Sequence, residues 1–212
     1  MLVLVNCAVE GRVPVTLATR TTRREVILRE SARLFAERGF HGVSIDDIGA
    51  AVGITGPGLY RHFTGKEALL GEILVSISER LLAGGRARSG GDDPYVVLAA
   101  LVDFHVDFAL SFPELITVQD RDFQTLRDED ARMVRRLQRA YVELWVDALR
   151  AVRPELDDDT ARAATHAAFG LLNSTPHGPG RGALGRPAMA ALLRDMARSA
   201  LLSGAAPPPS RP

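Results

Sequence analysis

Apolar residues recur along most of this chain at the spacing of amphipathic helices. Alternation of apolar and polar residues, which would indicate strands, is scarce beyond the N-terminus. The pattern therefore predicts an all-α protein of about nine helices. The predicted helices cover about residues 22–38, 45–52, 56–62, 65–83 and 94–110, a short one from 113, then 128–152, one capped at 157–159 that ends near 172, and 188–202.

One stretch in the first third of the chain carries the densest local signals. Ser44 and Asp47 have the spacing of a capping box, with Asp in place of Glu, and Gly53 suits the end of the helix that they begin. Thr55 is placed to cap a second short helix, and Pro57 fits its first turn. The stretch predicts two short helices joined by a tight glycine turn.

The second short helix is predicted to lie partly at the surface. Leu59 and Phe63 are four residues apart and face inward. Tyr60, Arg61 and His62 are then left nearer the outside.

A long helix is expected to follow at once. Thr64 and Glu67 have the spacing of a second capping box, which places the helix start near Gly65. The glycine pair Gly84-Gly85 is expected to end this helix, because glycine has a low helix propensity.

A short exposed helix braced by another one is the geometry that proteins use to enter a DNA major groove. The stretch resembles the DNA-binding domain of the TetR family of bacterial repressors, and the resemblance covers about residues 21–81. The residues that carry it are Phe35, Gly39, Ser44, Ile45, Ile48, Ala51, Val52, Gly53, Ile54, Leu59, Tyr60, His62, Phe63, Lys66, Glu67 and Leu69.

The resemblance implies roles for several of these side chains. In similar proteins the tyrosine and lysine that match Tyr60 and Lys66 contact phosphate, and the helix that contains Tyr60 enters the major groove. A hydroxyl at a helix start can also donate to a phosphate, and an arginine can recognise guanine. We therefore predict that the DNA-binding residues are Ser44, Thr55, Gly56, Pro57, Gly58, Tyr60, Arg61, His62 and Lys66.

The sequence departs from the commoner family pattern in the recognition helix. Gly56, Pro57 and Gly58 stand where many members carry longer side chains, so few side chains remain to read bases. Backbone approach, a contact of Pro57 with a thymine methyl group, and DNA shape would then carry more of the specificity. The basic residues Arg20, Arg23 and Arg24 are candidates for a minor-groove arm.

Simpler interpretations remain open at these positions. Tyr60 could lie at the edge of the core, Ser44 could serve only as a cap, and His62 could pack inside the domain. The arginines Arg61, Arg20, Arg23 and Arg24 could be solvated surface residues.

The later helices carry apolar stripes with scattered polar residues, as a small-molecule pocket does. The predicted pocket residues are Phe104, His105, Phe108, Tyr141, Trp145, His166, Phe169 and Asn173. An ordinary hydrophobic core is the alternative, because aromatic stripes at helical spacing usually form one. A metal site at His105 and His166 lacks a third ligand at suitable spacing, so no metal or other cofactor is predicted.

The resemblance further implies a homodimer that reads a palindromic operator on double-stranded DNA, with its recognition helices about 34–36 Å apart. Ligand binding would favour a different spacing and so release the operator. The last two helices of each subunit would form a four-helix bundle. The residues expected in it are Ala161, Ala164, Ala168, Leu171, Leu172, Met189, Leu192, Leu193, Met196 and Leu201.

Composition supports this assignment without proving it. The 212-residue chain has zero formal net charge, but from Arg12 to Lys66 nine basic residues stand against five acidic ones. A basic excess in the DNA-binding part suits attraction to phosphates. The predicted organisation is a disordered tail over 1–20, the DNA-binding domain over 21–81 with the helix-turn-helix at about 44–63, a ligand-binding and dimerisation domain over 82–203, and a disordered tail over 204–212.

Other classes find less support in the sequence. A single cysteine, Cys7, excludes an intramolecular disulfide framework. We identify neither an apolar run of membrane-spanning length nor a signal peptide, which favours a cytoplasmic bacterial protein. The pairs His105 with Asp107 and Asp122 with Asp128 lack a nucleophile or a phosphate loop beside them, so no enzyme is predicted. A DNA-binding architectural protein without a ligand remains the alternative.

Overall fold

The computed structural model describes residues 22–174 and 184–203, and these residues fold into helices without strands. The elements are α1 (Arg23–Arg38), α2 (Ile45–Val52), α3 (Gly56–Leu59), α4 (Lys66–Arg86), α5 (Pro94–Ser111), α6 (Pro113–Asp122), the 3-10 turn η1 (Phe123–Thr125), α7 (Asp128–Val152), α8 (Asp158–Leu172) and α9 (Arg186–Leu202). The prediction of an all-α protein is confirmed. Both predicted tails and Arg20 lie outside the described residues.

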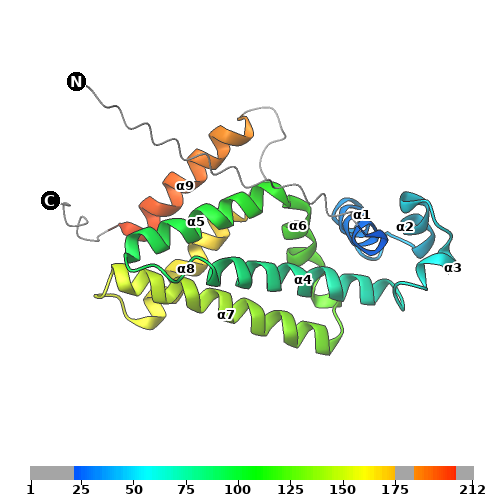
Figure 1. The fold of residues 1–212 in the computed structure, drawn as a ribbon, viewed down its shortest axis with the longest axis horizontal. Helices are drawn as coiled ribbons and strands as arrows, with labels where there is room; N and C mark the ends of the chain where they lie inside the picture. Colours follow the sequence, from blue (N-terminus) through cyan, green and yellow to red (C-terminus); the bar gives the residue numbers. More distant parts are fainter. Residues whose placement is uncertain (1–21, 175–183, 204–212) are drawn as a thin grey trace, which may run out of the picture.

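The helices form an elongated molecule with α1, α2 and α3 at one end (Figure 1). The long helix α4 begins beside α3 and runs back along α7, so that it belongs to both parts of the chain. At the other end α5 packs between α7 and α9, and α8 packs against α7 and α9. This arrangement leaves α3 at the far end of the molecule from α9.

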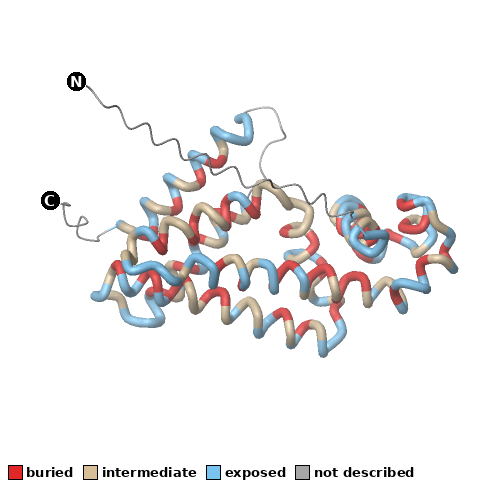
Figure 2. The backbone as a smooth tube through the Cα atoms, viewed as in Figure 1, coloured by how far each residue is buried: buried red, intermediate tan, exposed pale blue. Residues whose placement is uncertain are grey.

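Two hydrophobic cores stabilise the chain, and buried positions run along the inner face of every long helix (Figure 2). The first core contains the interior of α1–α4, but also Phe108, Val118 and Val134 from α5, α6 and α7. The second core lies between α4, α5, α7, α8 and α9 and contains Trp145, which has no exposed surface. The predicted domain boundary at residue 81 stays a prediction, and the first core extends beyond it.

The structure corrects two helix ends near the recognition segment. The helix predicted over 56–62 is shorter, because α3 ends at Leu59 and the following residues form turns. Glycine and proline at three of its four positions give it little intrinsic helix propensity. The capping box predicted for Thr64 is also wrong, since Gly65 is the N-cap of α4 and no side chain caps it.

The glycine pair in α4 does not end the helix, which was predicted to stop there. Both Gly84 and Gly85 lie inside α4, which continues to Arg86. A Cβ at Gly84 would lie 2.0 Å from Phe104 Cζ, and one at Gly85 would lie 2.7 Å from Tyr141 Cε2. The glycines therefore allow α5 and α7 to approach α4 closely.

The helix α5 is apolar and long enough to span a membrane by length and composition alone, which the sequence analysis did not recognise. In the structure eight of its residues are buried, and they pack against α7 and α9. Ion pairs add to this packing, because Arg194 and Arg198 of α9 both contact Asp103 of α5. This burial identifies α5 as a core helix of the bundle.

Candidate functional site

The two short helices at the end of the molecule are fixed by local hydrogen bonds. Ser44 Oγ accepts from the Asp47 N–H at 3.0 Å, and the Asp47 carboxylate accepts from the Ser44 N–H at 2.8 Å. The Ser44 hydroxyl also donates to the Asp47 carboxylate, and this bond, together with that from the Ser44 N–H, holds the pKa of the Asp47 carboxyl below its usual value. Gly53 adopts the left-handed conformation with φ 69°, which ends α2 as predicted.

The start of α3 is capped by a side chain and pressed against α2. Thr55 Oγ1 accepts from the Gly58 N–H at 3.3 Å, as the sequence predicts, and Pro57 lies in the first turn. Gly56 is buried, and a Cβ there would lie 2.4 Å from Asp46 Oδ1. The Asp46 carboxylate is the exposed end of a flexible side chain, so a larger residue at position 56 would require it to turn away.

The segment around α3 is anchored from within and exposed on its other side. Leu59 has no exposed surface and Phe63 keeps only 5%, so both face the core as predicted. The exposed residues of this segment are Thr55, Pro57, Tyr60, Arg61 and His62, and Gly58 is half-buried. Tyr60 keeps 57% of its surface, which rules out a place in the core.

Lys66 has a structural role that the sequence did not reveal. Its ammonium donates to the carbonyl oxygen of Phe40 at 2.8 Å and to that of Val43 at 2.7 Å. The same Nζ lies 4.3 Å from the centre of the Phe40 ring. An ammonium has three N–H donors, so one remains for the predicted phosphate contact, which stays a prediction.

Arg23 and Arg24 of the proposed minor-groove arm both make contacts within the helical domain. Arg23 donates to the carbonyl oxygen of Val52 at 3.0 Å and thereby caps the end of α2. Arg24 pairs with Glu72 and lies 4.6 Å from the Phe63 ring centre. Both side chains are therefore held against the helical domain in this structure.

A small cavity opens between α4, α5 and α6 and the end of α8. It encloses about 50 Å³, room for one or two water molecules. Known ligand pockets measure about 300–1,000 Å³, so this cavity is too small for a drug-sized ligand unless the surrounding helices move. Of the predicted pocket residues His105, Phe108 and Asn173 line it, together with Ile77, Leu81, Leu115, Ile116, Gln119 and Asp120.

His105 lies at the polar centre of this region. Its Nε2 is 3.0 Å from Asn173 Oδ1, which only accepts, and its Nδ1 is 3.2 Å from the Tyr141 hydroxyl. These two partners suit a neutral imidazole that donates from Nε2 and accepts at Nδ1. Burial lowers the pKa of His105 to about 4, with the Asn173 hydrogen bond opposing the shift, and burial raises the pKa of the Tyr141 phenol.

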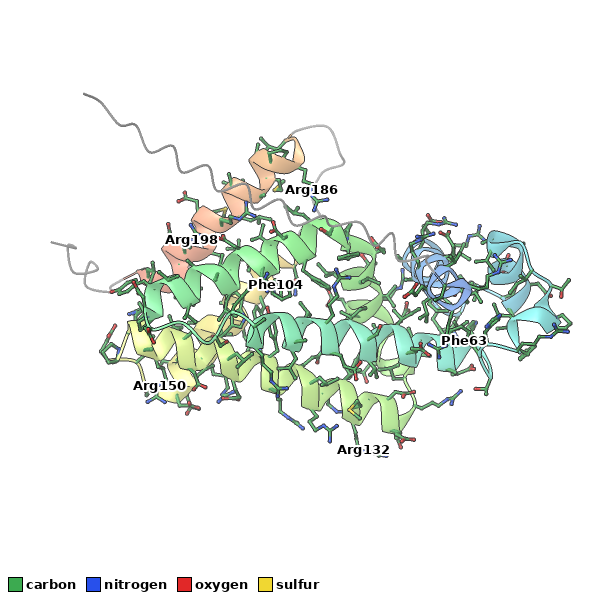
Figure 3. The ribbon with its side chains drawn as sticks, in the orientation of Figure 1. Phe63, Phe104, Arg132, Arg150, Arg186 and Arg198 are labelled. Carbon is green, nitrogen blue, oxygen red and sulfur yellow. The ribbon has the colours of Figure 1, made fainter. Side chains whose placement is uncertain are left out.

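The other predicted pocket residues form an aromatic cluster behind the cavity. The rings of His105 and Phe169 stack with centroids 4.9 Å apart, and Tyr141 stacks on Phe169 at 5.6 Å. Trp145 meets the edge of Phe169 at 4.9 Å, and its buried Nε1 has no hydrogen-bond partner among the described residues. Phe104 lies farther out, covered by the guanidinium of Arg88 (Figure 3).

His166 lies only at the outer edge of this group, where its ring meets that of Phe169 with centroids 6.5 Å apart. It is exposed, because the buried face of α8 is formed by Ala161, Thr165, Ala168 and Leu172. That face is displaced by about one residue from the predicted stripe. Alanines on both sides of α8 made the two stripes hard to distinguish.

Several residues of α8 and α9 that were expected in the bundle between protomers are instead buried within one protomer. Ala161, Ala168, Leu172, Leu193 and Leu201 are buried within the protomer, so they cannot be the outer surface of a bundle. On α9 the large apolar side chains that remain exposed are Leu192 and Met196, at 42% and 44%.

The candidate acid–base pairs do not meet. His105 faces Tyr141 and Asn173, whereas the exposed Asp107 pairs with Arg194 at 2.6 Å. Asp122 is buried and accepts from the Phe40 N–H. Within the described ranges no group of three or more His, Cys, Asp or Glu side chains is placed to hold a metal ion.

Comparisons with known proteins match both parts of this architecture. Residues 27–73 match the family model of bacterial regulatory proteins of the tetR family, and residues 91–201 match that of the tetracyclin repressor-like C-terminal domain. The HTH-type transcriptional repressor KstR2 of Rhodococcus jostii is 30% identical over 134 residues. That match covers 62% of this chain and 66% of KstR2, just under two thirds of its length.

Solved structures share the fold. A TetR-family transcriptional regulator from Bordetella parapertussis has a TM-score of 0.76 at 24% identity, with 84% of this chain and 93% of that chain covered. AibR in complex with isovaleryl coenzyme A and operator DNA has a TM-score of 0.71 at 21% identity, with 82% and 97% covered.

Proposed function

The chain belongs to the TetR family of bacterial regulatory proteins, and on that premise we propose that it is a homodimeric repressor of a palindromic operator, released by a small apolar or amphipathic effector. The observation that carries the proposal is the exposed surface formed by Thr55, Pro57, Tyr60, Arg61 and His62 at one end of the molecule. Its donors suit phosphates and base edges, and its anchor residues hold it rigidly.

Two subunits would place two such surfaces on one side of a duplex. The exposed Leu192 and Met196 of α9 supply apolar area for a contact between protomers. They are four residues apart on α9, so they lie on one face of the helix. A two-fold dimer through α8 and α9 would read two half-sites about one helical turn apart.

The effector would enter the region of His105. An apolar body suits the cavity wall formed by Ile77, Phe108 and Leu115, and the polar side chains of His105 and Asn173 in the same wall could orient it. AibR was solved with an acyl-coenzyme A thioester, so short acyl-coenzyme A thioesters and free fatty acids are the first probes to use.

A ligand-independent DNA-binding protein is the second candidate. The observation in its favour is the size of the cavity, about 50 Å³, which no drug-sized ligand fits without movement of the surrounding helices. The same binding assay separates the two candidates, because only a ligand-responsive repressor loses its operator when an effector is added.

The test begins with selection of bound fragments from a random DNA pool, which yields the operator. We expect Tyr60→Phe to weaken binding to different operator variants by a similar factor, because a phosphate contact carries no sequence information. Lys66→Ala should lower the slope of log affinity against log salt by about one if its ammonium displaces one counterion. Fluorescence anisotropy of labelled operator over a salt series measures both effects.

Arg150→Met is the matched control, because Arg150 lies at the opposite end of the molecule from Phe63 and α3 (Figure 3). Removal of its charge should leave the salt slope unchanged. Unaltered affinity and slope in both Tyr60→Phe and Lys66→Ala would contradict the assigned contacts. If purified protein selects no double-stranded DNA at low salt, the proposed function is wrong.

A further inference from the structure

The helix α6 belongs to the sensor part of the chain but packs chiefly on the DNA-binding part. It contacts α1 more extensively than α4 or α5. Its buried Val118 lies in the first hydrophobic core, with Ile27 and Phe35 of α1. A displacement of α6 would therefore directly change its packing against the helices that position α3.

Two adjacent residues at the end of α6 bond to the last turn of α1 and to the turn that follows it. The Arg121 guanidinium donates to the carbonyl oxygens of Phe35 and of Ala36, the latter at 3.2 Å. Asp122 is 5% exposed, and its Oδ1 accepts from the Phe40 N–H at 3.4 Å. Arg121 also donates to both Asp122 oxygens at 3.2 Å, so the two side chains form one unit.

The same turn is held on its other side by the first residue of α4. Lys66 donates to the carbonyl oxygens of Phe40 and Val43. The segment from Phe35 to Val43 is thus bonded to α6 and to α4 at once. Because α2 starts at Ile45, two residues after this segment, the position of the segment sets the position of α2 and α3.

The same helix α6 also forms part of the cavity wall. Ile116, Gln119 and Asp120 of α6 line the cavity beside His105 and Asn173. A surface hollow of about 220 Å³ lies beside the start of α6, between it and helices α1 and α4, and shares Ile77 and Leu115 with the cavity. Unfilled space removes packing contacts, so α6 has room to shift when the cavity is filled.

We propose that Arg121 and Asp122 are positioning residues that couple the cavity at His105 to the recognition segment, through their hydrogen bonds to the end of α1 and the turn that follows it. The inference rests on the proposed function, because it requires that the recognition segment binds DNA. Filling the cavity displaces α6, and these bonds carry the displacement to the segment from Phe35 to Val43. Coupling of this kind is reciprocal, so operator binding must also change the surroundings of the cavity.

Trp145 makes the reciprocal effect measurable without an identified effector. It is the one tryptophan in the chain, it is fully buried, and its ring lies 5.9 Å from that of His105. Its emission and its quenching by acrylamide therefore report on the sensor core alone. The experiment follows Trp145 fluorescence in the full-length protein while selected operator DNA is added, with a scrambled duplex as the reference.

We expect operator DNA to change the Trp145 signal in the wild type. Asp122→Ala and Arg121→Met should still bind the operator by anisotropy but lose this change. Asp122→Asn keeps an acceptor for the Phe40 N–H and should retain it. Arg127→Met removes an exposed arginine whose side chain makes no cap bond in α7 and should behave as the wild type.

Circular dichroism first establishes that each variant is folded. If Asp122→Ala does not fold, Arg121→Met alone tests the coupling role. If Asp122→Ala and Arg121→Met show the same operator-induced change in Trp145 fluorescence as the wild type, the coupling role is wrong. It is also wrong if bound operator leaves Trp145 unchanged in the wild type. A wild type that binds no DNA would overturn the proposed function itself, and the inference with it, which anisotropy registers separately.

Discussion

His105 is the residue whose chemistry the fold changes most. It is almost fully buried, it is neutral, and both ring nitrogens have partners in Tyr141 and Asn173. An unfolded histidine titrates near pH 6.5, whereas burial lowers the pKa of His105 to about 4. Between these values the unfolded chain binds a proton that the folded chain excludes, so acid favours unfolding.

This difference predicts a pH-dependent stability. As pH falls from about 6.5 to about 4, His105 should reduce the free energy of unfolding by roughly 1.4 kcal/mol per pH unit. His105→Gln should remove that part of the slope, and Tyr141→Phe, which keeps the imidazole buried, should retain it. Urea unfolding at a series of pH values measures the slope, and equal slopes in wild type and His105→Gln would refute the assignment.

Among the elements, α4 shows how packing overrides local propensity. Its Gly84-Gly85 pair has the composition of a helix end, yet α4 continues to Arg86 because α5 and α7 approach it there. The two glycines differ in what surrounds them. Gly84 faces the end of the half-buried Phe104 ring, whereas Gly85 faces Tyr141, which is 3% exposed and stacked in the aromatic cluster.

Substitution by alanine should therefore separate the two positions. Gly85→Ala should destabilise the protein by about 1–3 kcal/mol, because Tyr141 has no free space to move into. Gly84→Ala should be milder, since the Phe104 ring can rotate outward and alanine adds up to about 1 kcal/mol of helix propensity. Chemical denaturation of both variants gives the comparison, and an equal loss at the two positions would contradict the packing argument.

For the whole molecule, the exposed face of α9 decides where the protomers of the proposed homodimer could meet. The ion pairs of Arg194 and Arg198 with α5 and the burial of Leu193 and Leu201 fix one face of α9 inside the protomer. Leu192 and Met196 are left on its exposed side. This division leaves a narrower apolar strip for dimerisation than the sequence suggested.

In the proposed homodimer, Met196→Glu should therefore separate the protomers and weaken operator binding, because a charge would be desolvated at the contact. Val96→Glu is the control, since Val96 is 57% exposed on α5, away from α8 and α9 in sequence. Light scattering after size-exclusion chromatography gives the oligomeric state. A dimer of Met196→Glu with full operator affinity would place the interface elsewhere.

Local interactions decided what the sequence alone could specify. The Ser44–Asp47 capping box, the left-handed Gly53 and the full extent of α2 and α7 depend on residues a few positions apart, and each was predicted correctly. The exposure of Tyr60 follows from the same local spacing, because Leu59 and Phe63 fix which side of the segment faces inward.

Tertiary packing decided the rest. The outward position of His166 and the continuation of α4 past its glycines both depend on neighbouring helices that local sequence does not specify. The bonds of Arg121 and Asp122 reach residues 82 to 86 positions away, so no periodicity within α6 reveals them. Distant side chains and backbone groups meet only when the helices pack, which is why the sequence predicted most of the helices but not the connection between sensor and recognition segment.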